Sequence, residues 1–242
     1  MFSFFKNSPS SGKTAPYFPI AADMHSHILP GIDDGSPDVE TSLGLIKGLM
    51  EMGLKKSVAT PHIISDLYRN TPETIGNALD KLQAALDKNQ VNYKVSAAAE
   101  YMLDDWFFEL LKTGQPLLSI KDNIILTEFS FSYMPSHPEE MSFGIITEGY
   151  TPILAHPERY GYYHENMRMY DRLKELGFLL QVNLLSLTGY YGKDVAKAAK
   201  YIIKNGLASF VGTDLHHHKH LDAFRDAYTK GLFKEYLGHQ TW

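Results

Sequence analysis

Two histidines separated by one residue are the first sign of chemistry in this chain. His25 and His27 follow an apolar stretch that runs from Tyr17 to Ala22. In an extended strand, side chains two residues apart point to the same side, so both imidazoles can reach one point. A strand end offers a metal ion two ligands in this way, although a His-x-His pattern also arises by chance. The ends of the other strands therefore decide its meaning.

Ionisable residues follow six of the seven predicted strands: His25, His27, His62, Glu100, Glu128, His156, Asp214 and His216. The C-terminal ends of parallel strands meet on one face of a barrel, where active sites form. Core packing does not explain eight ionisable groups together, because burying charge is costly. Cations relieve the repulsion between carboxylates. Five imidazoles and three carboxylates, with Asp34 as a fourth, therefore predict two or three bound metal ions.

Seven strand-and-helix units position these residues. Short apolar strands are predicted near 18–24, 57–60, 93–99, 123–127, 151–155, 178–182 and 208–212. The first helix is expected to begin with Ser36 as its cap and Pro37 as its first residue, and the last to cover 220–237. Alternating strands and amphipathic helices imply parallel strands and right-handed crossovers. Seven units favour a barrel, with an open doubly wound sheet as the alternative.

Composition excludes several classes of protein. The 242 residues are long enough for one sizeable core, and the net charge of −5 gives no basic excess to hold a nucleic acid. The absence of cysteine excludes disulfides, thiolate metal sites and cysteine nucleophiles, and favours a cytoplasmic location. No apolar run reaches the ~18 residues that a membrane span requires. No Gly-x-Gly-x-x-Gly or Walker loop follows the first strand, which argues against nucleotide sites of those types.

The domain organisation is predicted to be simple. Residues 1–16 are expected to form a flexible arm, because 7–16 are rich in Ser, Pro, Gly and Thr. The aromatic residues at its start have two interpretations, a frayed terminus or a tether to a partner or membrane surface. Residues 17–242 are expected to form a single domain.

Several segments together resemble one family: 23–27 (Asp-Met-His-Ser-His), 30–35 (Pro-Gly-Ile-Asp-Asp-Gly), 60–62 (Thr-Pro-His), 156–160 (His-Pro-Glu-Arg-Tyr) and 213–216 (Thr-Asp-Leu-His). The combination resembles the PHP (polymerase and histidinol phosphatase) superfamily. Within it, the chain is most similar to the bacterial manganese-dependent protein tyrosine phosphatases encoded with capsule and exopolysaccharide genes. The resemblance covers about 21–237. It implies an α/β fold, a distorted TIM-like (β/α)7 barrel of the PHP type, with a three-metal cluster.

The resemblance also implies which residues share a metal ion. The first ion would be bound by His25, His27 and Asp214, the second by Glu128, His156 and a bridging Glu100, and the third by Asp34, His62 and His216. Mn²⁺ is the expected ion, although histidine and carboxylate ligands suit Fe, Zn²⁺ and Co²⁺ equally.

Hydrolysis of a phosphate ester fits these residue types. Metal ions lower the pKa of bound water towards ~7, so a metal-bound hydroxide is the expected nucleophile. Arg159 matches the family's phosphate-binding arginine, and it is expected to act in catalysis together with Asp214 and His216. No arginine follows the last strand end closely, so Lys219 or His220 is expected to complete the phosphate site.

The sequence leaves the substrate more open. Tyr160, Tyr162, Tyr163, Tyr190 and Tyr191 could stack on a phosphotyrosine ring, but in a chain with 15 tyrosines they also fit a tyrosine-rich surface. The predicted function is dephosphorylation of a phosphotyrosine protein, namely a membrane-bound bacterial tyrosine kinase of polysaccharide export. The alternatives are a histidinol-phosphate phosphatase and a PHP-type metal-dependent nuclease module.

Four polar residues beside the motifs are expected to play lesser parts. Asp33 is predicted to be a turn residue only, and His217 a surface histidine. Asp23 is expected to accept a hydrogen bond at a strand end. Glu158 is expected to support the metal ligands without binding a metal ion itself.

Overall fold

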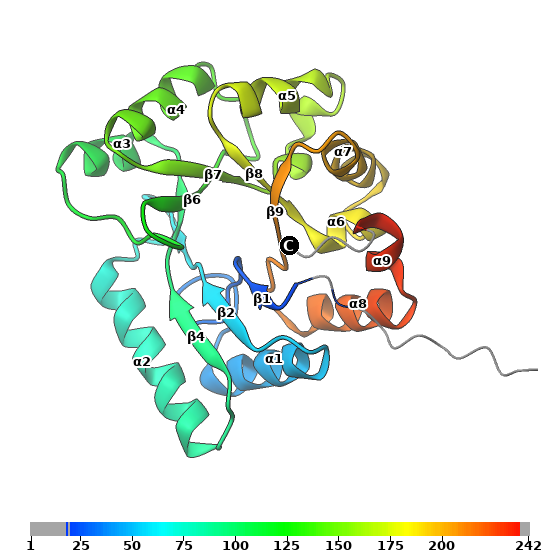
Figure 1. Ribbon diagram of the computed structural model, residues 1–242. Coiled ribbons are helices and arrows are strands. Elements are labelled where there is room, and N and C mark those ends of the chain that lie inside the picture. The colour runs from blue at the N-terminus through cyan, green and yellow to red at the C-terminus, as the bar shows by residue number, and fades with distance from the viewer. Residues whose placement is uncertain (1–17, 19, 238–242) are drawn as a thin grey trace, which may run out of the picture.

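The computed structural model describes residue 18 and residues 20–237, so the predicted arm lies outside the described residues. Strands alternate with helices around a ring (Figure 1). The strands are β1 (Ala22–Asp23), β2 (Lys56–Ala59), β3 (His62–Ile63), β4 (Lys94–Ala97), β5 (Glu100–Met102), β6 (Ile124–Glu128), β7 (Thr151–Ala155), β8 (Leu179–Asn183) and β9 (Ala208–Gly212). The helices are α1 (Val39–Glu51), α2 (Pro72–Lys88), α3 (Asp105–Lys112), α4 (Pro138–Thr147), α5 (Arg168–Glu175), α6 (Leu184–Thr188), α7 (Lys193–Lys204), α8 (His218–Thr229) and α9 (Leu232–Leu237).

The strands form two parallel sheets, ordered β1-β2-β4 and β3-β5-β6-β7-β8-β9. Backbone hydrogen bonds beyond the strand ends close the ring. The amide of Asp214 donates to the carbonyl of His25 at 2.8 Å, and that of His27 donates to Leu215 at 2.9 Å. The second and third predicted strands are each broken in two, so seven predicted strands become nine. The result is the predicted distorted α/β barrel.

The breaks correct two details of the prediction. His62 and Glu100 open the short strands β3 and β5, whereas both were expected to follow a strand's last residue. The predicted strand over 93–99 stops at Ala97, and the buried Ala98 and Ala99 carry the chain into the second sheet. Small side chains suit this crossing because both alanines are completely buried. The two residues still lie at the same end of the barrel as the other strand ends.

The start of α1 was predicted two residues too early. Asp38 caps the helix by accepting a hydrogen bond from the Thr41 amide at 2.8 Å. Ser36 belongs to the preceding loop, because its amide donates to the His27 carbonyl and its carbonyl accepts from Gly31. These bonds fold the loop against the end of the first strand.

Other helix boundaries show which signals are reliable. Helix α2 begins at Pro72 with Thr71 as its cap, as the cap-then-proline pattern predicts. The predicted last helix is split into α8 and α9 at Gly231, whose φ of +71° interrupts the helix. Helix α6 was not predicted. In the described ranges no helix has both the length and the apolar character to cross a membrane.

Candidate active site

The nine predicted metal ligands lie together at the C-terminal end of the barrel. Four overlapping groups have ligand atoms within 4.8 Å of one another: His27 with Asp34, His62 and His216; His25 with His27 and Glu100; His25 with His156 and Asp214; and His62 with Glu100 and Glu128. Every predicted ligand belongs to at least one of these groups. The fold thus brings together residues as far apart in the sequence as His25 and His216.

Two of the three ligand sets implied by the resemblance are compact. Asp34, His62 and His216 fall within one group. His25 Nε2 lies 3.3 Å from Asp214 Oδ1, and His27 Nε2 lies 3.5 Å from the same oxygen. The second set differs, because Glu128 groups with His62 and not with His156. Strand pairing explains this, since β5 lies between β3 and β6 and brings both side chains to Glu100.

The histidine tautomers favour a cation between the rings. His25 Nδ1 donates to Gln181 Oε1 at 2.8 Å, and His27 Nδ1 donates to Asp33 Oδ2 at 2.8 Å. Each neutral ring therefore keeps a lone pair on Nε2, and these two nitrogens lie 3.2 Å apart. Two acceptors at that distance repel each other unless a proton or a metal ion lies close to both.

Buried polar atoms without partners point to the same place. Nine buried side-chain atoms make no hydrogen bond within the described residues, and five of the nine belong to predicted ligands: His62 Nδ1, Glu100 Oε2, Glu128 Oε1, His156 Nδ1 and Asp214 Oδ1. Leaving a buried polar atom unsatisfied costs about 1–3 kcal/mol, so such atoms are rare without a reason. Coordination of divalent cations supplies that reason, and this donor set fits them.

The pKa values of several groups in the cluster are strongly shifted. Burial lowers the pKa of His62, but the carboxylates of Glu128 and Glu100 raise it to about 9. Burial raises the pKa of Asp34, but His216 and the other histidines lower it to about 2. The pKa of Asp214 lies well below its usual range, because His25 and other cations outweigh burial. The carboxylates of Asp34 and Asp214 therefore stay ionised at neutral pH, and a metal ion competes with a proton for the imidazole of His62.

A cavity of about 260 Å³ opens beside the cluster. It is lined by Asp34, His62, Glu128, Phe131, His156, Arg159, Tyr191, Asp214, His216, His217 and His220. Arg159 Nη1 donates to Asp214 Oδ2 at 2.8 Å. Its guanidinium carbon lies 4.9 Å from the centre of the Phe131 ring and 4.5 Å from that of Tyr191. These cation–π contacts hold the arginine next to the ligands.

Known proteins are similar to this chain in sequence and in structure. The family model described as "Capsular polysaccharide synthesis, CpsB/CapC" matches residues 21–228.

The chain belongs to the CpsB/CapC family.

The tyrosine-protein phosphatase YwqE of Bacillus subtilis is 32% identical over 198 residues, which cover 81% of this chain and 78% of that protein. The putative tyrosine-protein phosphatase CapC of Staphylococcus aureus is 28% identical, over 80% and 76%. The crystal structures of YwqE and of CpsB from Streptococcus pneumoniae, described as unique metal-dependent tyrosine phosphatases, include a chain with TM-score 0.81 and 29% identity over 91% and 89%. A Listeria monocytogenes lactonase, with TM-score 0.54 and 12% identity, shares the fold alone.

Two buried side-chain amides support the predicted ligands of this CpsB/CapC protein. Gln181, which accepts from His25, donates from Nε2 to Asn183 Oδ1 at 2.9 Å. Asn183 Nδ2 in turn donates to Asp214 Oδ2 at 2.7 Å. Through these bonds, Gln181 and Asn183 link the predicted ligands His25 and Asp214, which follow the first and last strands. Sequence reasoning missed this link, although Asn183 ends the one strand that lacks an ionisable end residue.

Asp33 makes more contacts than its predicted role in a turn requires. Its Oδ2 accepts from the His27 ring and from the His62 amide at 3.2 Å, and its Oδ1 accepts from the Gly35 amide. A carboxylate behind a ligating imidazole fixes the ring's tautomer and direction. Its position directly before the predicted ligand Asp34 was the available signal.

Two further acids act as the sequence suggested. Asp23 accepts from the amide and the hydroxyl of Thr213, which joins the first and last strands. Glu158 Oε1 accepts from the Asn183 amide at 2.9 Å and from the Ser186 hydroxyl at 2.7 Å. Each buried carboxylate ties backbone near the ligands without facing the cavity.

Lys219 and His220, the two candidates for the second phosphate contact, lie in different environments. His220 lines the cavity, but burial and the neighbouring His217 and His216 lower its pKa to about 4, so it offers a neutral ring and no charge. Lys219 is exposed and does not line the cavity. His217 is exposed, as predicted, and it also lines the cavity.

Most of the tyrosines that could stack on a phosphotyrosine ring lie outside the lining of the cavity. Tyr160 and Tyr163 are buried in the core, and of the five tyrosines named, Tyr191 alone lines the cavity in the described part of the chain. Phe131 supplies the other aromatic ring and also stacks on His156. Sequence reasoning missed Phe131, which follows the strand end at Glu128 by three residues.

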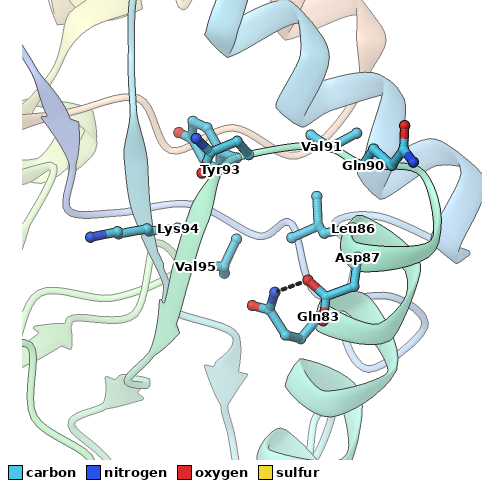
Figure 2. A pocket seen from close by; sticks show the side chains of 9 residues that line it. Gln83, Leu86, Asp87, Gln90, Val91, Tyr93, Lys94 and Val95 are labelled. Atoms are coloured by element: carbon cyan, nitrogen blue, oxygen red, sulfur yellow. Dashed lines mark hydrogen bonds between the residues drawn. The ribbon is translucent and has the colours of Figure 1, made fainter.

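A larger hollow shows that size does not identify the site. It measures about 640 Å³ and lies at the other end of the barrel, where the chain enters β4 (Figure 2). Its lining residues are Gln83, Leu86, Asp87, Gln90, Val91, Asn92, Tyr93, Lys94 and Val95. None of the nine predicted ligands is among them.

Proposed function

We propose that this CpsB/CapC protein is a metal-dependent protein-tyrosine phosphatase, a hydrolase of phosphoric monoesters. The observation that carries the proposal is the convergence of nine histidine and carboxylate side chains, several with unpartnered atoms, beside Arg159. Relatives over most of the chain are named tyrosine-protein phosphatases. The nine residues are the proposed ligands of two or three divalent ions, with Mn²⁺ as the first choice.

The metal ions would supply positive charge to phosphate oxygens and lower the pKa of the water that they coordinate. The residues of the chain orient the substrate around them. Arg159 has five N–H donors, and its Nη1 donates to Asp214. The remaining donors can bind non-bridging phosphate oxygens. Asp214 therefore serves both the metal cluster and the arginine, and His216 completes the third ligand set.

The aromatic wall favours an aryl phosphate. Phe131 and Tyr191 flank Arg159, so a phosphate bound there places its ester group beside two rings. A phenol has a pKa of ~10 and leaves with less proton donation than an alkyl alcohol. The cavity therefore does not require a dedicated general acid for phosphotyrosine.

The physiological substrate is proposed from the family's role. A phosphorylated tyrosine kinase of capsule or exopolysaccharide export, bound to the membrane, is the expected partner, and the phosphatase would act on it from the cytoplasm. The family's description as a capsular polysaccharide synthesis family supports this choice.

The test is hydrolysis by Mn²⁺-reconstituted protein of a phosphotyrosine peptide, histidinol phosphate and single-stranded DNA, each with and without chelator. Release of phosphate from the peptide, lost with chelator, is the expected result. Arg159→Ala should lower kcat/KM by about 10²–10³-fold, the scale for removing one group that stabilises transition-state charge. Arg172→Ala is the matched control, because Arg172 is exposed on α5. Preference for histidinol phosphate, or cleavage of DNA alone, would refute the proposal.

A further inference from the structure

Helix α7 carries four lysines at helical spacing. Lys193, Lys197, Lys200 and Lys204 follow one another at intervals of four, three and four residues, which places them on one face. All four are exposed. Asp194 is the one acidic residue in the helix, although the whole chain has a net charge of −5. This set of four lysines is called the lysine face below.

Among the side chains that the structure describes, no carboxylate forms an ion pair with the lysine face. Within the described ranges no ion pair involves any of the four, and Lys200 instead lies over the Tyr236 ring at 4.4 Å. Helix α2 differs in composition, because its Lys81 and Lys88 share the helix with three acidic residues and the helix therefore carries no excess of positive charge. A positive face that lacks internal partners is suited to an external anion.

A hollow of about 450 Å³ lies along the lysine face. It is lined by Thr188, Gly189, Lys193, Ala196, Lys197 and Lys200. A short turn, 189–192, separates this hollow from the active-site cavity. Tyr191 in that turn lines the cavity and contacts Arg159, while Gly189 and Lys193 line the hollow. A ligand that leaves the cavity over the turn therefore meets the lysines directly.

We propose that the lysine face binds an acidic segment that flanks the phosphotyrosine of a protein substrate. The inference rests on the proposed phosphatase function and adds a rule for substrate choice. From Lys193 to Lys204 the helix rises about 16 Å, which about five residues of extended peptide span. Lys193 is two residues from Tyr191, so acidic side chains within a few positions of the phosphotyrosine can reach the first lysines.

An anionic membrane is the other possible partner of such a face. The concave hollow and its continuity with the cavity favour a peptide. In addition, the large apolar side chains that are exposed in the described ranges lie outside α7, so the helix offers no group to insert into lipid. The membrane is therefore an outcome of the test.

The experiment compares three phosphotyrosine peptides, with flanking Glu, Gln or Lys residues, and p-nitrophenyl phosphate as a substrate without flanks. The Mn²⁺-loaded full chain is measured beside Lys193→Gln/Lys197→Gln and the matched control Lys81→Gln/Lys88→Gln on α2. The wild type should prefer the Glu peptide through KM by about three- to tenfold, as two exposed ion pairs predict. The first variant should lose this preference with kcat and p-nitrophenyl phosphate hydrolysis unchanged. Salt should also reduce it.

Three results would overturn the inference. The first is equal kcat/KM for the Glu and Gln peptides in an enzyme that hydrolyses both, which would leave the phosphatase function intact. The second is the same change in the α2 control. The third is charge-dependent cosedimentation with phosphatidylglycerol vesicles that the first variant loses, without any peptide preference. Failure to hydrolyse every phosphate ester would instead refute the phosphatase function, and this inference with it.

Discussion

The two ends of the barrel treat polar groups in opposite ways. At the C-terminal end, buried carboxylates and imidazoles crowd together and several of their atoms lack partners. At the other end, two pairs of polar side chains lie at the hollow of Figure 2. Gln83 donates to Asp87 at 3.0 Å, and the hydroxyl groups of Tyr93 and Ser57 lie 2.6 Å apart. One end presents a donor set that fits cations, and the pairs at the other end contribute to the fold.

Two of the proposed ligands also have an unusual backbone conformation. His156 and Asp214 have φ values of +35° and +52°, in the left-handed region that costs a non-glycine residue about 1–3 kcal/mol. Both are proposed ligands, so the strain lies where the chain must turn a side chain into the cluster. Gln90, at the other end, also has a positive φ of 55°, but it follows the end of α2, where a left-handed residue is ordinary. Unpartnered atoms and strained ligands together mark the functional end.

The largest effect is expected from Asp214. Asp214→Asn removes the charge that faces His25, His27 and Arg159, so kcat/KM for p-nitrophenyl phosphate should fall by at least about 10³-fold. Metal content, measured by inductively coupled plasma mass spectrometry, should fall with it. Asp122→Asn is the control, since Asp122 is exposed and also has a positive φ. Full metal content and activity in Asp214→Asn would remove the distinction between the ends.

Asp33 should affect metal affinity more than folding. Asp33→Asn weakens the bond that orients His27, and loss of such a partner lowers metal affinity by about 10–100-fold. Titration of the chelator-stripped protein with Mn²⁺ measures this. Excess Mn²⁺ should restore most of the activity. Asp38→Asn, which keeps a good helix cap on the same loop, should bind Mn²⁺ like the wild type. Equal affinities in both variants would return Asp33 to the role of a turn residue.

Phe131 should affect the aromatic part of the substrate. Phe131→Ala removes one ring beside Arg159, and KM for a phosphotyrosine peptide should rise by about three- to tenfold, the scale of one aromatic contact. KM for an alkyl phosphate should change less, because it has no ring to stack. Phe143→Ala removes an exposed phenylalanine from α4 and serves as the control. An equal rise for aryl and alkyl phosphates would mean that Phe131 only holds the arginine.

The smallest effect on activity is expected at the other end. Tyr93→Phe removes the hydroxyl that pairs with Ser57, so the free energy of unfolding should fall by about 1 kcal/mol. Denaturant unfolding measures this change, while kcat and metal content should stay at the wild-type values. Altered kinetics without a loss of stability would mean that the two ends are coupled.

The sequence alone determined the parts that depend on local spacing. Alternating strands and helices predicted the α/β barrel. Ionisable residues at strand ends predicted eight of the nine side chains that converge, and the family resemblance assigned the ninth, Asp34. Thr71 and Pro72 predicted the start of α2, because a cap acts within three or four residues. Such signals need no knowledge of distant partners.

The tertiary structure decided which strand ends face each other. Gln181 contacts His25 across 156 positions, and Asp23 contacts Thr213 across 190. The place of Glu128 beside His62, and of Phe131 over Arg159, likewise follows from the order of β3, β5, β6 and β7 around the ring. Periodicity fixes the face on which a side chain lies, but strand order and register choose its partner. Supporting contacts between distant strands were therefore beyond the sequence pattern.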